Sequence, residues 1–425
     1  MKQEDSNMNL YEYLYNNSSN PYCIELLQYE INSRIYYFGN NFASPKERKI
    51  SVKERSINFL SYLYRKVKTK SIKKSNNLII SNAYFSVNDE IKKNGFEVAI
   101  PWWTIKKGGS YIKHQKIEKL FNEINGSLKN DTIPDLISET FINKIILFKK
   151  LLKDFIEPTE IKAIILSNDL GFFERVFIDA FKEKEILTFI YLHGLPARYN
   201  YIDDNRADYL IVWGDKIKNN YINAGVDGNK IIVAGHPFYN SNKFSKIQFN
   251  LNDVLVISKT KCGTPLSSDN VILSDRGNCL IYLEMIKEVL FSYGVKKVRL
   301  RLHPSESENW YSNNIDNVFF ELDNNSLKDS LKNTSMVIGP TSTVFLESIY
   351  AGVNYLIFEP QEDGLDILKN KVVDPFDGVN NNLPVAKSVK ELSCLIRDKK
   401  TVSGQILKDY FTEKFDMTKV FEKIN

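Results

Sequence analysis

Two segments in the C-terminal half place polar side chains directly after short apolar runs. The run at 298–302 ends in His303-Pro304, and the run at 336–338 ends in Gly-Pro-Thr-Ser-Thr at 339–343, where a helix is predicted to begin. Both runs are rich in aliphatic residues and are typical of strands. In open α/β sheets, ligands bind at the carboxyl ends of strands, and the first N–H groups of a helix attract anions. The sequence therefore predicts a phosphate-binding site.

This predicted site has further candidate members. Gly339 allows close backbone approach, and the three hydroxyls at 341–343 exceed what one helix cap requires. Glu347, one helical turn later, either accepts hydrogen bonds from ribose hydroxyls or packs as a buried helix charge. Lys259 follows the apolar run 253–258 and is a cation that could offset phosphate charge. The candidate ligands of a phosphorylated molecule are His303, Pro304, Gly339, Thr341, Ser342, Thr343, Glu347 and Lys259.

Candidate catalytic residues lie at two strand ends in the N-terminal half. Asp169 follows the apolar run 161–167, and a carboxylate there suits a general base or a nucleophile. The alternative is a helix cap, but Asn168 could supply that cap and leave Asp169 for catalysis. His193 ends the run 187–192, just before a glycine, and is the second catalytic candidate.

Other features concern possible partners. Trp102-Trp103 either form a platform for a sugar ring or cover a sheet edge, and Arg198 is a further candidate for binding an acceptor. Residues 46–75 are basic, with aromatic and aliphatic residues interleaved, which fits either contact with an anionic membrane surface or a solvated helix packed on its own domain. No recognition motif supports nucleic-acid binding.

Composition narrows the class of protein. The 425 residues favour two domains, and 43% hydrophobic with 26% charged residues is ordinary for a globular chain. No stretch approaches the ~20 apolar residues that span a bilayer, and the N-terminus lacks the layout of a signal peptide. Four scattered cysteines indicate neither zinc nor disulfides, and no HExxH, P-loop or GxGxxG motif is present. We expect a cytoplasmic protein that needs no metal or cofactor.

Apolar runs alternate with helical patterns, which predicts βαβ units and mostly parallel sheets. The pattern lapses at 241–252, so we expect a domain at 1–240, a linker at 241–252 and a domain at 253–425 whose last helix could cross back. The strands expected in the first half are 34–38, 77–81, 96–101, 161–167, 187–192, 208–212 and 230–234, and the helices are 53–68, 115–124, 134–154 and 172–184. In the second half we expect strands at 253–259, 297–302, 336–338 and 354–358, and helices at 280–293, 326–333 and 343–351.

Several of these motifs occur together in a known group of enzymes. GPTSTVFLESIYAG at 339–352 resembles the nucleotide-binding half of GT-B glycosyltransferases. RLHP at 301–304 followed by the Ser-Thr turn resembles bacterial sialyltransferases and capsule Kdo transferases, and 167–237 is similar to the N-terminal half of surface-polysaccharide transferases, CDP-glycerol polymerases among them. The resemblance implies two Rossmann-like domains facing a central cleft. It also implies that His303, Ser342 and Thr343 contact the donor's cytidine monophosphate.

The resemblance also implies an activity. We expect transfer of a CMP-activated 2-keto sugar acid (sialic acid, Kdo or another nonulosonic acid) to a capsule, O-antigen or lipooligosaccharide glycan. The nucleotide-sugar donor would meet a lipid-linked acceptor, with the enzyme peripheral on the inner face of the bacterial membrane. The resemblance makes Asp169 the base or nucleophile, although the acidic-acidic-Gly motif of several sialyltransferase families is replaced by Asn-Asp-Leu-Gly at 168–171.

Alternatives remain open at this point. They are a transferase using a UDP- or GDP-sugar, a CDP-polyol phosphotransferase with His193 as base, an isomerase of the UDP-GlcNAc 2-epimerase type, and a non-enzymatic glycan- or nucleotide-binding scaffold. Inverting and retaining mechanisms are likewise both open.

Overall fold

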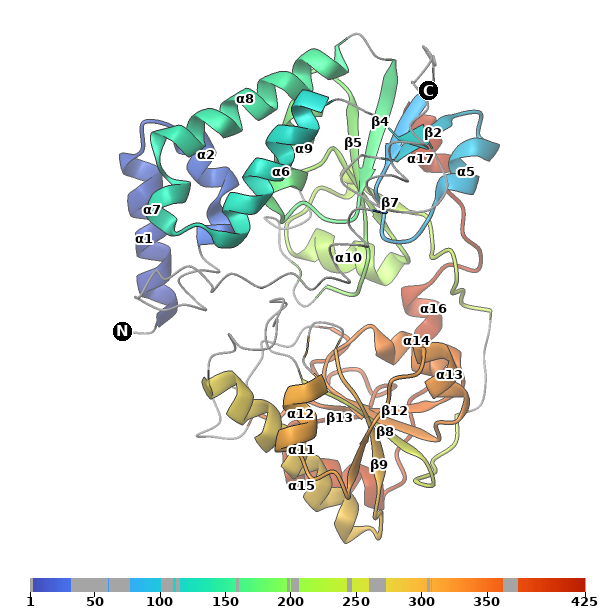
Figure 1. The fold of residues 1–425 in the computed structure, drawn as a ribbon. Helices are drawn as coiled ribbons and strands as arrows, with labels where there is room; N and C mark the ends of the chain where they lie inside the picture. Colours follow the sequence, from blue (N-terminus) through green and yellow to red (C-terminus); the bar gives the residue numbers. More distant parts are fainter. Residues whose placement is uncertain are drawn as a thin grey trace.

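The chain forms two α/β domains, each built on one parallel sheet (Figure 1). A computed structural model describes residues 3–31, 60, 77–100, 110–111, 115–157, 160–196, 199, 206–242, 247–259, 273–303, 306, 308–361 and 374–424. Within these residues, the order of the first sheet is β3-β2-β1-β4-β5-β6-β7 and that of the second is β10-β9-β8-β11-β12-β13. The second order is the Rossmann order, and the first extends it by one strand. The predicted fold class, two Rossmann-like domains of the GT-B type, is confirmed.

The strands are short and mostly buried. Strands β1, β4, β8, β11 and β12 carry almost unbroken apolar sequences, as parallel strands covered on both faces do. The first sheet comprises β1 (Leu78–Ser81), β2 (Glu97–Ile100), β3 (Ser110–Tyr111), β4 (Ile161–Leu166), β5 (Leu187–Tyr191), β6 (Tyr209–Val212) and β7 (Ile231–Val233). The second comprises β8 (Val254–Ile257), β9 (Val298–Arg301), β10 (Phe320–Leu322), β11 (Met336–Gly339), β12 (Asn354–Phe358) and β13 (Val385–Ala386).

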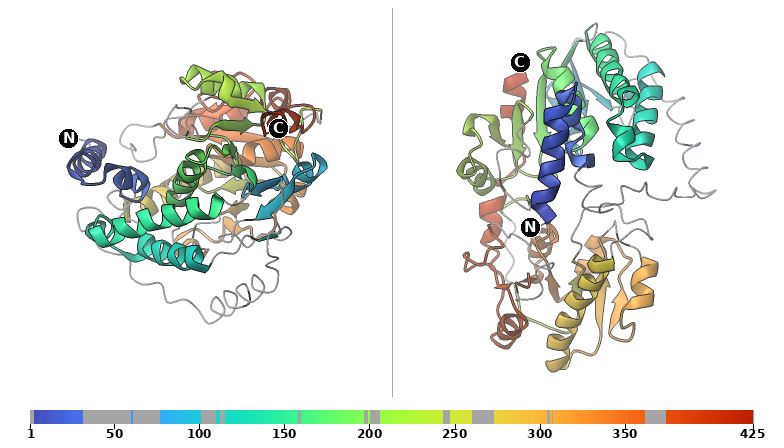
Figure 2. Two further views of the ribbon diagram at one scale, coloured as in Figure 1. Left: turned by 90° about the horizontal axis from the view of Figure 1, so that it is seen from above. Right: turned by 90° about the vertical axis from the view of Figure 1, so that its left-hand side faces the viewer.

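Helices pack around both sheets (Figure 2). The helices of the first half are α1 (Gln3–Asn17), α2 (Pro21–Leu26), α5 (Asn88–Lys93), α6 (Gln115–Asn130), α7 (Ile133–Leu136), α8 (Glu139–Ile156), α9 (Phe172–Lys182), α10 (Asp215–Asn223) and the 3-10 turn η2 (Gly228–Lys230). Those of the second half are α11 (Leu273–Ser292), α12 (Glu308–Asn314), α13 (Leu327–Lys332), α14 (Val344–Tyr350), α15 (Val389–Arg397), α16 (Ile406–Tyr410) and α17 (Thr418–Ile424). Each of the described helices is too short or too polar to cross a lipid bilayer.

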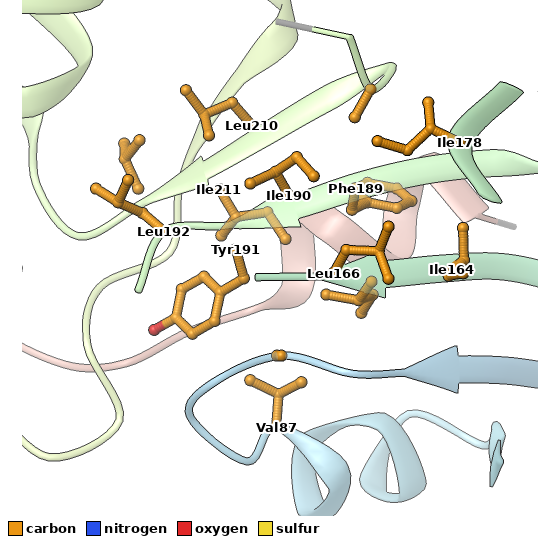
Figure 3. Close-up of a cluster of buried hydrophobic side chains, with 14 of the residues drawn as sticks. Val87, Ile164, Leu166, Ile178, Phe189, Ile190, Tyr191, Leu192, Leu210 and Ile211 are labelled. Atoms are coloured by element: carbon orange, nitrogen blue, oxygen red, sulfur yellow. The ribbon is translucent and has the colours of Figure 1, made fainter. Parts of the chain in front are cut away.

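The core of the first domain centres on β4, β5 and β6. Figure 3 shows their side chains packed against Ile178 of α9 and against Val87, which precedes α5. Among them, Phe189, Ile190 and Tyr191 of β5 are fully buried. This packing fixes the loops that follow β4 and β5, where the candidate catalytic residues lie.

The C-terminal segment returns to the first domain. Phe421 of α17 stacks on Phe96 with ring centroids 5.6 Å apart, and Figure 1 shows α17 beside β2 and α5. On the way, the N–H of Thr412 donates to the carbonyl of Trp213 at 3.2 Å, and that of Asp416 donates to Ala234 at 2.8 Å. These contacts tie the two halves of the chain together at the side opposite the chain's first helices.

The described elements agree with most of the expected strands and helices. The expected helix 134–154 is wrong in one respect, because it is two helices, α7 and α8, separated at Ser138. The Ser138 hydroxyl accepts a hydrogen bond from the N–H of Phe141 at 3.3 Å and so caps a new helix. The short strands β3, β10 and β13 were not expected. The expected strand 34–38 lies outside the described residues, as does helix 53–68 except for Leu60.

Candidate functional site

The candidate phosphate-binding residues of the second domain follow three strands that lie side by side. Strand β8 pairs with β9 on one side and with β11 on the other. Ser258 and Lys259 follow β8, His303 follows β9, and Gly339 ends β11. The order of strands reverses between β8 and β11, and such a switch point is where open α/β sheets bind ligands. The structure thus brings the predicted residues to one edge of one sheet.

A carboxylate that was not predicted holds the loop of His303. The main-chain N–H of His303 donates to Glu306 Oε2 at 2.7 Å and to Ser258 Oγ at 3.1 Å. Glu306 also accepts from the hydroxyl of Ser258 and, at 2.7 Å, from that of Tyr311. The carboxylate of Glu306 therefore holds the loop of His303 in place through these hydrogen bonds, while the imidazole of His303 is exposed. Pro304 lies outside the described residues.

Lys259 differs from its predicted role as an accessible cation. Its side chain is 2% exposed and forms an ion pair with Glu359, which is 0% exposed. The other oxygen of Glu359 accepts the N–H of Thr341 at 2.6 Å. Because the ammonium group is neutralised and covered, Lys259 is better placed to position the turn after β11 than to contact a phosphate. We correct its assignment accordingly.

The turn after β11 depends on the absence of a side chain at Gly339. A Cβ there would lie 2.5 Å from the hydroxyl of Tyr355 and 2.8 Å from Ile257. The same Tyr355 hydroxyl donates to the carbonyl of Pro340 at 2.8 Å and fixes the turn. Gly339 therefore allows close packing within the turn after β11, and its predicted contact with a ligand stays a prediction.

The three hydroxyls that follow behave differently from one another. Ser342 Oγ accepts the N–H of Val344 at 3.3 Å, as a helix-capping residue does. Thr341 Oγ1 is buried and has no hydrogen-bond partner within the described part of the chain. Thr343 stands at the N-cap of α14 but forms no capping bond with its side chain. Of the three, Thr343 is therefore the residue whose hydroxyl neither caps the helix nor is buried, and the burial of the Thr341 hydroxyl argues against its predicted contact with a ligand.

Glu347 lies on α14, one turn beyond these hydroxyls. Burial raises the pKa of its carboxyl above the usual range, an effect that the charge of Arg301 partly opposes. No hydrogen bond or ion pair to its carboxylate is formed within the described residues. Desolvation of a carboxylate without a hydrogen-bond partner is unfavourable, so donors on a ligand, such as ribose hydroxyls, would be favourable neighbours.

Asp169 is not the accessible base that the sequence predicts. Its side chain is 3% exposed, and its Oδ2 accepts the N–H of Arg206 at 2.9 Å. Asn168 supplies the expected cap, since its side-chain oxygen accepts the N–H groups of Leu170 and Gly171 at 3.2 and 3.3 Å. The carboxylate of Asp169 instead ties the end of β4 to the start of β6. This geometry favours a structural role.

His193 has the geometry of an oriented base. The imidazole is exposed, and its Nδ1 lies 2.9 Å from the carbonyl oxygen of Ser167. A carbonyl only accepts hydrogen bonds, so Nδ1 carries a proton, and in the neutral ring Nε2 keeps its lone pair. A Cβ at the adjacent Gly194 would lie 3.3 Å from the side chain of Thr343. The end of β5 in the first domain therefore meets the hydroxyl turn of the second.

His236, which occupies a similar sequence context, is a structural histidine. It is 2% exposed among aromatic rings, and its Nδ1 accepts the N–H of Phe238 at 3.1 Å. Burial lowers its pKa to about 3. The ring is therefore neutral at ordinary pH and holds the loop after β7.

Trp102, Trp103 and Arg198 lie outside the described residues, as does the basic segment 46–75 apart from Leu60. Among described residues, no group of three or more histidine, cysteine or acidic side chains could hold a metal ion. The two residues that sequence reasoning missed, Glu306 and Glu359, carried weak signals. One stands three residues after His303, and the other directly ends an apolar strand.

Comparisons with known proteins give only distant likenesses. No protein-family model and no curated protein matches the chain. Among solved structures, the chain is similar to a UDP-GlcNAc 2-epimerase of Methanocaldococcus jannaschii in complex with UDP-GlcNAc and UDP, at 11% identity and a TM-score of 0.43 over 78% of this chain and 97% of that one. It is also similar to the wall teichoic acid polymerase TagF, at 13% identity and a TM-score of 0.41 over 89% and 97% of the two chains.

A third similar structure is the lipopolysaccharide outer core galactosyltransferase WaaB in its apo form, at 11% identity and a TM-score of 0.41 over 82% of this chain and 98% of that one. None of these three is a sialyltransferase or a Kdo transferase, so that part of the resemblance remains a prediction. With TM-scores below 0.5, the likenesses carry no argument about activity. The assignment of function depends on the site itself.

Proposed function

We propose that this protein is a GT-B glycosyltransferase that moves a sugar from a nucleotide-activated donor to an acceptor hydroxyl. One observation carries the proposal: the oriented imidazole of His193 in one domain lies at the point where that domain meets the hydroxyl turn at 341–343 of the other. A base on one side and anion-binding groups on the other are what such a transfer requires.

In this proposal, the second domain binds the donor. The hydroxyl of Thr343 and the imidazole of His303 contact the phosphate, and Glu347 accepts hydrogen bonds from the ribose. Glu306 and Glu359 touch no ligand; they hold the two loops in place through the N–H groups of His303 and Thr341. Preorganised donors of this kind stabilise charge as it develops on a leaving phosphate.

The chemical step follows from these positions. Nε2 of His193 takes the proton of the acceptor hydroxyl as the acceptor oxygen forms a bond to the anomeric carbon. The bond from that carbon to the phosphate oxygen breaks, and its electron pair leaves with the nucleotide. The proton passes from His193 to solvent before the next cycle. Attack by the acceptor oxygen itself inverts the anomeric centre.

The donor we favour is a CMP-linked 2-keto sugar acid, and the acceptor is a lipid-linked bacterial surface glycan met at the inner face of the membrane. The sequence resemblance at 301–304 and 339–352 supports this choice. We also propose that the transfer needs no metal, because the CMP leaving group carries a single phosphate. A thermal-shift screen with CMP, CDP, UDP and GDP tests the donor. A ligand at 100 times its Kd adds about 2.7 kcal/mol of stability, and stabilisation by UDP without CMP would reject the donor.

A second candidate is a phosphotransferase that uses a CDP-polyol. The observation that favours it is a contrast between the two catalytic candidates. The carboxylate of Asp169 is buried and hydrogen-bonded to the N–H of Arg206, whereas the imidazole of His193 is exposed. There the acceptor oxygen would attack the phosphorus next to the polyol, and CMP would leave with the electron pair of the broken P–O bond. Product analysis after incubation with CMP-sugars or with CDP-glycerol separates the two transferases, while turnover of UDP-GlcNAc without any acceptor would indicate an epimerase.

Replacement of His193 by Asn tests the catalytic assignment. The Asn amide can still donate to the carbonyl of Ser167, but the base is lost, so we expect turnover to fall by about 10²–10⁴-fold. Nucleotide binding should persist. Asp169→Asn serves as the comparison, since its carboxylate holds the N–H of Arg206 and not a substrate. Its main effect should be on stability, and a larger loss of turnover in folded Asp169→Asn than in His193→Asn would reverse the assignment.

A further inference from the structure

Two large aromatic side chains stand exposed on the first domain, and one of them lies near the candidate base. Tyr84, in the loop after β1, is 65% exposed, and Phe238, in the loop after β7, is 63% exposed. The ring of Tyr84 lies 6.1 Å from the imidazole of His193, centroid to centroid. Single exposed apolar residues are common on protein surfaces. Here, however, both rings lie at the carboxyl ends of the parallel strands, where open α/β sheets bind ligands.

Both exposed rings rest on the same third ring. Phe85 contacts Tyr84 edge-on, with centroids 5.0 Å apart, and Phe238 edge-on at 6.0 Å. Phe85 is itself held against buried rings, including Trp213 at 6.1 Å and His236 at 4.4 Å. The loop after β1 is therefore anchored in the core by Phe85, and its neighbours Tyr84 and Phe238 are held in place while exposed. We name Tyr84, Phe85 and Phe238 the aromatic platform.

We propose that the aromatic platform binds the acceptor through the apolar face of its terminal sugar ring. A pyranose presents a face of C–H groups that packs against an aromatic ring, and its hydroxyls remain at the edge. A sugar in van der Waals contact, about 4 Å above Tyr84, would present an edge hydroxyl toward the imidazole 6.1 Å away. This inference rests on the proposed function, since it identifies the class of molecule whose hydroxyl His193 activates.

The position of the platform favours an acceptor sugar over the donor's nucleobase. Tyr84 and Phe238 belong to the first domain, on the side of His193, whereas the residues proposed to hold phosphate and ribose belong to the second. The platform also differs from the sequence prediction, which assigned acceptor binding to Trp102, Trp103 and Arg198.

The test compares saccharide binding by four variants with that of the wild-type protein. The probe is an array of immobilised neutral and acidic oligosaccharides, used with and without saturating CMP or CDP. Tyr84→Ala and Phe238→Ala should each weaken binding by about three- to tenfold, the range expected for one aromatic contact. Tyr84→Phe should retain binding because the ring is kept. Phe291→Ala is the matched control, since Phe291 is 64% exposed but lies on α11 of the other domain.

Both alanine variants should keep the wild-type melting temperature, because the replaced rings are exposed. Unchanged binding by Tyr84→Ala and Phe238→Ala would overturn the proposal, and so would the absence of saccharide binding by the wild-type protein. Binding to phosphatidylglycerol vesicles that is lost in these variants, with saccharide binding intact, would identify a membrane contact instead. If no nucleotide stabilises the protein, the proposed function fails, yet the comparison of saccharide binding still decides the role of the platform.

Discussion

The buried ion pair of Lys259 and Glu359 predicts a large loss of stability when one partner is removed. The two side chains are 2% and 0% exposed. Replacing Lys259 by Met leaves the carboxylate buried without its counter-charge, which costs about 3–5 kcal/mol. In a domain of ~150–250 residues each kcal/mol lowers Tm by about 2–4 °C. We therefore expect Lys259→Met to lower the Tm of the second domain by about 6–20 °C.

Differential scanning calorimetry measures this shift in Tm, and two further variants serve as controls. Lys332→Met removes an ion pair of Lys332 and Asp329 whose side chains are 61% and 59% exposed, and should cost under about 1 kcal/mol. Lys259→Met combined with Glu359→Gln removes both charges, while the Gln oxygen can still accept the N–H of Thr341. The double variant should regain at least half of the lost Tm. If Lys259→Met and Lys332→Met shift Tm equally, the reasoning about this pair is refuted.

Three other predictions follow from the same structure. Glu306→Gln should weaken nucleotide binding by about tenfold, because the amide group would face donors that now meet a carboxylate. Isothermal titration calorimetry measures the affinity, and an unchanged affinity would contradict the prediction. Gly339→Ala should destabilise the second domain by about 1–3 kcal/mol, since the added Cβ meets two side chains within 3 Å. Thermal unfolding measures this effect, and an unchanged Tm would argue against close packing at Gly339. His236 has a pKa of about 3 in the folded protein, below its ordinary 6.5, so only the unfolded state takes up its proton between these values. Stability should therefore fall by about 2 kcal/mol from pH 7 to pH 5, and His236→Gln should remove that part of the slope. Equal slopes in both proteins would contradict burial of a neutral ring.

The fold was largely predictable because parallel strands buried on both faces have a distinctive sequence. Runs such as those of β4 and β12 contain few polar residues, and the helices between them keep a helical period. The break at Ser138 was harder to predict, because a serine within an apolar helical pattern is compatible with either one helix or two. Short edge strands such as β10 carry too few residues to show a pattern.

The placement of the candidate residues was predictable where it follows directly from their position relative to the strands. His193 and His303 each follow a strand, and both are exposed at a carboxyl edge. Asp169 also follows a strand, but its partner, the N–H of Arg206, is 37 residues away and leaves no signal in the local sequence. Lys259 finds its partner 100 residues away. Sequence position indicates which edge of the sheet a polar side chain reaches, whereas burial depends on partners that only the assembled fold brings together.

The loss of Lys259 as a phosphate ligand changes what the site can bind. Among described residues, a phosphate at the proposed donor site would meet the exposed imidazole of His303 and the hydroxyl of Thr343, but no exposed lysine from the loop after β8. Neutral hydroxyls and one imidazole compensate a single phosphate group better than the greater charge of a diphosphate. Under the proposed function, in which His193 rather than Asp169 is the base and a CDP-polyol donor is the second candidate, the site therefore favours a leaving group with one phosphate. CMP should stabilise the protein more than CDP at equal concentration, and the reverse order would contradict this reasoning.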